Sequence, residues 1–475
     1  MPDPIVMMTA TDLAARIRRR ELSCRDVMVA TLDHIDRVNP AVNAIVALRS
    51  RTDLLAEADA ADARPATGPL HGLPHAVKDL AATAGITTTL GSPLFAGNVP
   101  ARDAIFVERL RAAGAILIGK TNTPEFGLGS QTYNPVYGTT GNAYDPACTA
   151  GGSSGGAAVA LALRMVPLAD GSDFAGSLRN PAGWNNVFGF RPSAGRVPSG
   201  PAPELFLTSI STEGPMARTV TDLALLLSVM AGPDARAPLS LEGIPDFTRP
   251  LARDMTGVRI GWLGDLGGIP MAPGMLALCR SGLDRLTAAG VTIEAATLGI
   301  DRETIWRSIT TLRQAFQAGR LGPLYHDPAK RAQMKPEAVW EIERGFALRA
   351  TDVYDASVDR SAVYTAFRAA FATYDFLALP TAQVFPFAAT QPWPGEIAGV
   401  AMDSYHRWME IVAAPSLAGL PTAAVPAGFG PDGLPSGIQL IGPPRQDLSV
   451  LQLAYAYEQV SADVLGRLPP LLSGM

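Results

Sequence analysis

Two segments decide the expected fold: HAVKDL at residues 75–80 and DAIFVERLRAAGAILIG at residues 103–119. The hexapeptide is predicted to be a buried strand. Residues 103–113 place their apolar side chains at helical spacing, and residues 114–119 form a second short apolar run. Strand, helix and strand in this order are typical of an α/β protein whose sheet is covered by helices on both faces.

The same alternation continues along the chain. Thr9–Asp12 and Ser23–Asp26 fit helix capping boxes within a helical stretch at residues 9–39. We expect one domain over residues 1–475, with a helical N-terminal segment at residues 1–65 and a helical cap beside the active site at roughly residues 300–374. Further core strands are predicted at residues 258–263, 376–379, 423–427 and 437–442.

Composition excludes several classes of function. The net charge of −5 and the lack of a long basic run argue against a nucleic-acid partner. The three cysteines are far apart and form neither a disulfide framework nor a zinc pattern, so no metal site is expected. No apolar run is long enough to span a membrane, and residues 1–10 lack the pattern of a signal peptide. We therefore expect a cytoplasmic protein, monomeric or homodimeric.

Lys78 is the first candidate for a chemical role. Only four of the 39 basic residues are lysines, and Lys78 stands in an apolar strand. Loss of hydration disfavours the ammonium form, so a buried lysine can act as a neutral base. The alternative is a structural lysine, either with its amine reaching solvent or paired with Asp79.

Two Gly- and Ser-rich segments follow. Residues 151–156 read GGSSGG and precede an apolar helix, so two hydroxyls stand at a helix N-terminus; the same letters also suit a flexible turn or an anion cradle. Residues 171–181 read GSDFAGSLRNP, and their successive amides can converge on an oxyanion. The alternative for this second segment is a turn held by an Asp173–Arg179 ion pair.

The order and spacing of these motifs resemble the amidase signature family. Lys78, GGSSGG and the D-x-x-G-S-x-R segment occur in sequence, with 24 positions from Ser153 to Ser177. The flanking text agrees, in GKTNTPEF at residues 119–126 and GFRP at residues 189–192. The resemblance is strong from about residue 70 to 230 and looser from 375 to 460, and it implies an α/β/α sandwich with a large mixed, twisted sheet.

The resemblance also implies roles for individual residues. Ser177 corresponds to the serine that becomes acylated, Ser153 to a relay serine on a cis peptide bond, and Lys78 to the base. The backbone amides of Phe174, Ala175, Gly176 and Ser177 correspond to the oxyanion hole. The supporting residues are Ser154, Asp173 and Arg179.

The chain departs from the family pattern at four positions. Phe174 and Ala175 stand where the family usually has Thr and Gly, which puts the shape of the acyl pocket in question. Ala150 replaces a common proline, and His75 occupies a position that is usually apolar.

The resemblance predicts an amidohydrolase that cleaves linear carboxamides, with esters or carbamates as further candidate substrates, and without metal or cofactor. Its partners would be small-molecule substrates. One alternative is the transamidating subunit of a multi-protein amidotransferase. The other is a Ser-His-Asp esterase, because residues 152–156 also fit G-x-S-x-G around Ser154. The two late histidines, His326 and His406, are expected in helical, polar surroundings, which disfavours that esterase.

Overall fold

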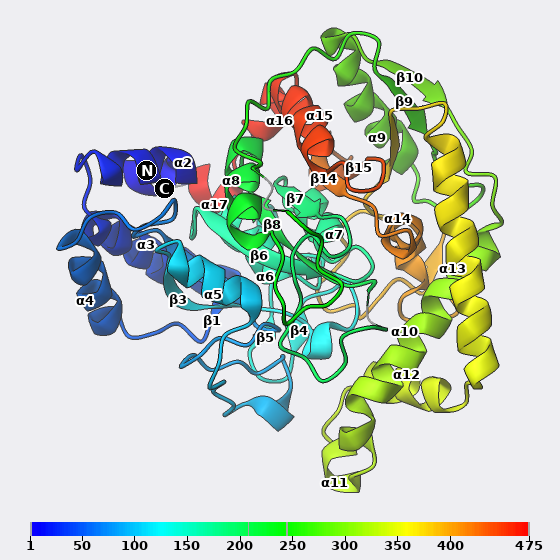
Figure 1. Ribbon diagram of the computed structural model, residues 1–475, viewed down its shortest axis with the longest axis horizontal. Coiled ribbons are helices and arrows are strands. Elements are labelled where there is room, and N and C mark those ends of the chain that lie inside the picture. The colour runs from blue at the N-terminus through cyan, green and yellow to red at the C-terminus, as the bar shows by residue number, and fades with distance from the viewer. Residues whose placement is uncertain (1, 208, 244–245, 474–475) are drawn as a thin grey trace.

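The computed structural model describes residues 2–207, 209–243 and 246–473. Its main feature is an 11-stranded mixed sheet with helices on both faces, as expected from the alternation of strands and helices (Figure 1). In spatial order the strands are β1 (Ile45–Val46), β3 (Ile116–Thr121), β2 (Pro74–Lys78), β6 (Leu168–Asp173), β8 (Thr212–Ala217), β7 (Phe188–Arg191), β14 (Thr422–Phe429), β15 (Pro435–Ile441), β11 (Phe376–Pro380), β9 (Arg259–Trp262) and β10 (Thr292–Ala295).

The middle of the sheet is antiparallel from β6 to β11, and parallel pairs stand towards each end, β3–β2–β6 on one side and β11–β9–β10 on the other. Two short hairpins lie outside it, β4 (Tyr133–Asn134) with β5 (Gly138–Thr139), and β12 (Glu396–Ile397) with β13 (Val400–Ala401). The strands predicted around residues 75–80, 114–119, 258–263, 376–379, 423–427 and 437–442 are confirmed with small shifts of their ends.

The α-helices are α1 (Pro4–Met7), α2 (Ala10–Arg18), α3 (Cys24–Val38), α4 (Arg51–Asp62), α5 (Ile105–Ala112), α6 (Gly155–Ala162), α7 (Arg179–Trp184), α8 (Val220–Met230), α9 (Met275–Asp284), α10 (Arg302–Tyr325), α11 (Pro328–Arg331), α12 (Pro336–Phe346), α13 (Ala350–Ala370), α14 (Ala413–Leu417), α15 (Asp447–Gln459), α16 (Ala462–Leu465) and α17 (Pro470–Ser473). Five 3-10 turns are η1 (Asn39–Ala41), η2 (Pro93–Phe95), η3 (Glu125–Gly127), η4 (Arg285–Ala289) and η5 (Arg407–Val412).

The two capping boxes expected near the N-terminus have different outcomes. At α3 the box is complete, because Ser23 Oγ accepts from the Asp26 amide and Asp26 Oδ2 accepts from the Ser23 amide. At α2, Thr9 Oγ1 accepts from the Asp12 amide, but the return bond is missing from the described contacts. The carboxylate of Asp222 instead accepts from the first two amides of α2 at 2.9 Å each, so a distant residue completes this helix end.

The candidate site described below lies where two hydrophobic core clusters meet. The large core cluster joins the sheet to α3, α5, α6 and α8, and α6 is buried along its whole length. A second cluster packs α10, α13 and α14 against β11 and η5. The helices α10, α12 and α13 lie together at one side of the molecule (Figure 1), and the inner face of α10 approaches the ends of β6 and β8.

Candidate active site

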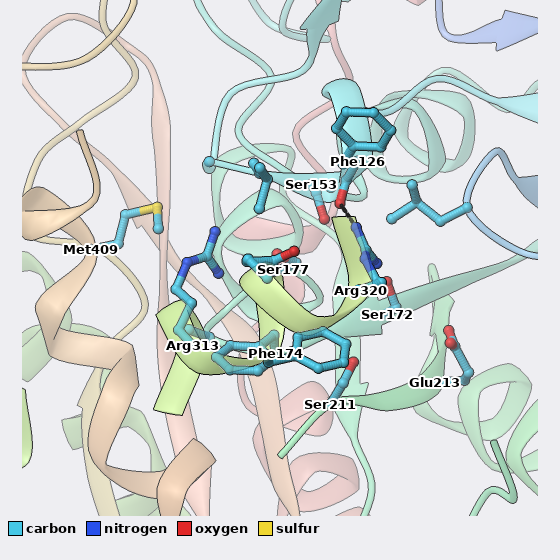
Figure 2. A pocket seen from close by; sticks show the side chains of 17 residues that line it. Phe126, Ser153, Ser172, Phe174, Ser177, Ser211, Glu213, Arg313, Arg320 and Met409 are labelled. Atoms are coloured by element: carbon cyan, nitrogen blue, oxygen red, sulfur yellow. Dashed lines mark hydrogen bonds between the residues drawn. The ribbon is translucent and has the colours of Figure 1, made fainter. Parts of the chain in front are cut away.

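A pocket of about 150 Å³ opens where α10 approaches the end of β6. Its wall includes Ser153, Ser172 and Ser177 together with Arg313 and Arg320 of α10, and Figure 2 shows the two arginines on either side of Ser177. Segments far apart in the sequence therefore meet in one cavity, and the GGSSGG loop, the turn after β6 and α10 each contribute polar groups to it.

Lys78 ends β2, and its amine lies against two serines of the pocket wall. The residue is only 1% exposed, and its Nζ lies 2.8 Å from Ser153 Oγ, 2.8 Å from Ser154 Oγ and 2.9 Å from Ser172 Oγ. Burial lowers the pKa of Lys78 to about 8, against the opposing effect of nearby carboxylates. An ammonium can donate to all three hydroxyls, whereas a neutral amine has a lone pair that accepts from one of them. The alternative pairing of Lys78 with Asp79 does not occur, because Asp79 binds Thr89.

The GGSSGG loop is fixed by close contacts with neighbouring segments of the chain. The peptide bond between Gly152 and Ser153 is cis, as the family resemblance implied. The Ser130 hydroxyl donates to the Gly152 carbonyl at 2.6 Å, which fixes the loop on the side away from Lys78. At Gly156 a Cβ would lie 2.3 Å from the amide nitrogen of Asn122, so only glycine allows α6 to start this close to the chain after β3.

The turn after β6 is organised by Asp173. Arg179 donates to both carboxylate oxygens at 2.9 Å, Arg191 donates at 3.1 Å, and the Gly176 amide donates at 2.8 Å. Burial by itself would raise the pKa of Asp173, but the two guanidiniums outweigh it and hold that pKa well below its usual range. The expected Asp173–Arg179 pair is thus present, and it shapes the turn that carries Ser177.

This turn leaves the Ser177 side chain facing the pocket. The residue is half-buried, and in the described part of the chain its hydroxyl makes no hydrogen bond. Its carbonyl accepts from the Ser154 amide at 3.3 Å, which ties the turn to the GGSSGG loop. Gly176 has a φ of 94°, a conformation that favours glycine.

One of the four amides assigned to the oxyanion hole is already engaged. The Gly176 amide donates to Asp173 Oδ1 and so holds the turn. Among the described contacts, the amides of Ala175 and Ser177 have no such acceptor. The amides available to stabilise an oxyanion beside Ser177 are therefore those of Ala175 and Ser177, while the Gly176 amide holds the conformation of the turn.

Phe174 lines the pocket, as its unusual position in the motif suggested. Its ring is stacked on Phe316 of α10, with centroids 6.3 Å apart, and the Arg313 guanidinium lies 5.5 Å from the ring centre. Arg313 is itself bound to Glu341 at 2.5 Å and to Tyr405 at 2.8 Å. The ring of Phe174, which departs from the family pattern, thus packs the turn after β6 against α10.

Three further residues were not found from the sequence. Ser172 supplies the third hydroxyl around Lys78, and Glu213 of β8 places a carboxyl group on the pocket wall. Asp170 accepts from His75 Nε2 at 2.9 Å and from the Lys78 amide. His75, which occupies a usually apolar position, therefore links β2, the strand of Lys78, to β6. Ser172 lies within the GSDFAGSLRNP segment, but which face of β6 it occupies follows only from the placement of the strand.

A Ser-His-Asp arrangement finds no support in the geometry. Ser154 Oγ contacts Lys78, and no histidine lines the pocket within the described residues. The expectation of polar surroundings for His406 is met in part. Ser404 Oγ lies 2.9 Å from its Nδ1 and Glu341 Oε1 lies 3.5 Å from its Nε2, but the rings of Trp306, Trp340 and Tyr405 also pack around it, and burial lowers its pKa to about 4. Its ring packs against α10 and α12 at the start of η5.

Two other classes of site find no support in the described ranges. No group of three or more His, Cys, Asp or Glu side chains there is placed to hold a metal ion. None of the described helices is long and apolar enough to cross a membrane.

Comparisons with known proteins agree with the motif. A family model described as Amidase matches residues 26–451. An acylamidase of Rhodococcus erythropolis is 34% identical over 463 residues, which is 95% of each chain. A glutamyl-tRNA(Gln) amidotransferase subunit of Methylococcus capsulatus is 34% identical over 95% of this chain and 97% of its own. The crystal structure of a bacterial aryl acylamidase of the amidase signature enzymes matches with a TM-score of 0.92 at 29% identity, covering 98% of this chain and 99% of that one.

Proposed function

The chain belongs to the amidase family, and from this premise we propose that it is an amidohydrolase that cleaves carboxamide C–N bonds through an acyl-enzyme on Ser177. The observation that carries the proposal is the contact of a buried lysine with serine hydroxyls beside a free serine hydroxyl. Lys78 Nζ lies 2.8 Å from Ser153 Oγ, and Ser177 faces the same pocket without a partner among the described residues.

The proposed reaction moves one proton in a cycle. Neutral Lys78 takes the proton of Ser153, and Ser153 takes the proton of Ser177 as the Ser177 oxygen bonds to the substrate carbonyl carbon. The same relay returns the proton to the leaving nitrogen as the C–N bond breaks. Water then attacks the acyl carbon and gives one proton to the relay, which returns it to Ser177 Oγ as the bond between that oxygen and the acyl carbon breaks and the acid leaves.

The surroundings suit these steps. We assign to the amides of Ala175 and Ser177, which have no acceptor among the described contacts, the stabilisation of the negative charge on the carbonyl oxygen of the tetrahedral intermediate. The tight binding of Asp173 by Arg179 and Arg191 keeps the turn rigid, so that these amides need not reorganise during the reaction. No step requires a metal or a cofactor.

Covalent labelling tests the proposal without knowledge of the substrate. A fluorophosphonate probe should modify Ser177, as read by peptide mass spectrometry, and Ser177→Ala should abolish labelling while thermal unfolding remains unchanged. Turnover on a panel of amides should fall by about five to six orders of magnitude in the same variant. Modification of Ser154 instead would contradict the assignment and favour the esterase.

A transamidating role is the second candidate, and the similarity to a glutamyl-tRNA(Gln) amidotransferase component favours it. The distinguishing measurement is the fate of the nitrogen released from the amide of glutamine, which a hydrolase leaves as free ammonia and an amidotransferase passes to an acceptor. A stand-alone hydrolase should turn over simple amides as an isolated chain. Activity that appears only with copurifying proteins and an aminoacyl-tRNA acceptor would replace the hydrolase proposal with this one.

A further inference from the structure

Glu213 is an acidic group in the pocket that the proposed mechanism does not use. It lies on β8, is half-buried and lines the cavity together with Ser153, Ser172 and Ser177. In the described part of the chain its carboxyl group makes no hydrogen bond, and no basic atom lies within 4 Å of it. Burying such a group without a partner is costly, so its presence calls for an explanation.

The register of the sheet places Glu213 next to the Lys78 cluster. Glu213 is directly opposite Ser172 in the antiparallel pairing of β8 with β6. Directly opposed residues project from the same face of a sheet, and the Ser172 hydroxyl lies 2.9 Å from Lys78 Nζ. The Glu213 side chain therefore leaves the sheet on the side of Lys78, and Figure 2 shows it on the same part of the pocket wall as Ser172 and Ser211.

We propose that Glu213 is a positioning residue for the base: its carboxylate, next to Ser172, keeps Lys78 protonated up to a higher pH than burial alone would allow. The proposal rests on the function proposed above, because it assigns Lys78 the role of base. It adds a group that sets the pH range in which this base is available.

The electrostatics of the two groups agree with this geometry. Burial raises the pKa of Glu213 to about 7, and the positive charge of Lys78 limits that rise. Burial lowers the pKa of Lys78 to about 8, and the charge of Glu213 is the strongest opposing influence. Each group thus favours the charged form of the other, as expected for coupled sites.

Other charged groups near the pair are largely compensated. Asp170 is bound by His75 and by the Lys78 amide, and Asp173 is held by two arginines. Across the pocket, Arg313 is paired with Glu341. Arg320 is an exception: among the described residues it has no acidic partner, and it donates to the Phe126 carbonyl at 3.0 Å. Glu213 is therefore the carboxyl group of the pocket wall whose charge acts on Lys78 without a partner of its own among the described residues.

Removal of the carboxylate should make the base available at lower pH. In Glu213→Gln the strongest of the influences that raise the pKa of Lys78 is lost, while the burial that lowers it remains. Neutral Lys78 should then form at a pH about one unit lower than in the wild type. The Glu213→Asp variant keeps the charge on a shorter side chain, farther from Lys78, and its midpoint should fall between those of the wild type and Glu213→Gln.

The experiment measures the rate at which phenylmethanesulfonyl fluoride modifies Ser177 from about pH 5 to about pH 10, which follows the neutral fraction of Lys78 without any substrate. Glu458→Gln is the matched control. Burial raises the pKa of Glu458 to about 7 as well, but its neighbours are Val220 and Asp222 instead of Lys78. Its labelling midpoint should equal that of the wild type.

The outcomes separate the two proposals. Failure of wild-type Ser177 to react would overturn the proposed function. Reaction at Ser177 with the same midpoint in wild type and Glu213→Gln, or with a higher midpoint in the variant, would overturn the role of Glu213 alone. If Glu213→Gln does not fold, as judged by its thermal unfolding, the Glu213→Asp variant decides: a midpoint below that of wild type supports the proposal and an unchanged one refutes it.

Discussion

Lys78 of β2 and Lys120 of β3 are two buried lysines on neighbouring strands. Both are 1% exposed or less, and burial lowers the pKa of each to about 8. Yet Lys78 Nζ contacts three serine hydroxyls at the pocket, whereas Lys120 Nζ donates to the Ala81 carbonyl at 2.7 Å and to Thr83 Oγ1 at 2.8 Å. Burial and pKa therefore do not identify a catalytic lysine; its partners do.

The register explains why the two amines go to different places. Lys120 is paired with Val77 in the parallel ladder, so it projects from the face that Val77 occupies. Lys78 is the next residue and projects from the opposite face, because side chains alternate along a strand. On one face the Lys78 amine lies against the GGSSGG loop, and on the other the Lys120 amine lies against the turn after β2. The Thr83 hydroxyl itself donates to Ala81, so the Lys120 site offers only acceptors for a charged amine and no reacting group.

The largest expected contrast is in turnover. Lys78→Ala should lower kcat/KM on an amide by about 10³–10⁴-fold, since a general base is lost, whereas Lys120→Ala should lower it by less than about tenfold. Steady-state hydrolysis at about pH 9 measures both, where the wild-type Lys78 amine is mostly neutral.

A second pair of variants tests whether the lysine acts by its lone pair or by its charge. Lys78→Arg keeps the charge but cannot accept a proton, so its rate should stay as low as that of Lys78→Ala. Near-normal activity in Lys78→Arg would end the assignment of a base. Lys120→Arg provides the corresponding exchange at the structural site.

A smaller contrast concerns the hydroxyl groups that each lysine contacts. Amide cleavage needs a proton on the leaving nitrogen, whereas a nitrophenyl ester has a leaving group that departs without one. Ser153→Ala should therefore lower amide hydrolysis about 10²-fold more than ester hydrolysis, and Thr83→Ala should change both rates to the same extent. Matched amide and ester substrates with one acyl group give the ratio. Equal losses on the two substrates in Ser153→Ala would mean that Ser153 only supports the loop.

The smallest expected effect is one in which the two lysines behave alike. Each has a folded-state pKa near 8, below the usual value in an unfolded chain, so above about pH 8 the unfolded state binds more protons and the free energy of unfolding rises with pH. Each lysine should add about 1 kcal/mol to the free energy of unfolding between about pH 7 and pH 9. Lys78→Met and Lys120→Met should each remove that increase in urea unfolding measured at the two pH values. A loss in only one variant would show that the two environments differ energetically as well as chemically.

The contrast also shows how far the sequence leads. Lysine is rare in this arginine-rich chain, and both Lys78 and Lys120 stand in apolar runs. Composition alone therefore makes each of them a candidate for a chemical role. The spacing of GGSSGG and the D-x-x-G-S-x-R segment relative to Lys78 distinguished it. Each motif is a short continuous segment whose residues are constrained by the local backbone. Both can therefore be recognised in the sequence without the fold.

Residues that act through pairing between strands were beyond that reasoning. Glu213 lies 36 positions after Ser177 and belongs to neither motif, and only the β6–β8 register brings it opposite Ser172. The aromatic part of the surroundings of His406 was missed for the same reason, because Trp306 and Trp340 come from α10 and α12.

The sequence by itself determined the α/β class, six strands of the sheet (β2, β3, β9, β11, β14 and β15), the family, and the three residues proposed as nucleophile, relay and base, because periodicity and short Gly- and Ser-rich motifs depend on neighbouring residues. Only the tertiary structure decided which amine meets the serines, which amide of the turn is already engaged by Asp173, and how Phe174 stacks on Phe316. These contacts depend on strand register and on the docking of α10. A shift of one residue in a strand would turn Lys78 to the other face of the sheet, and no local pattern in the sequence fixes that choice.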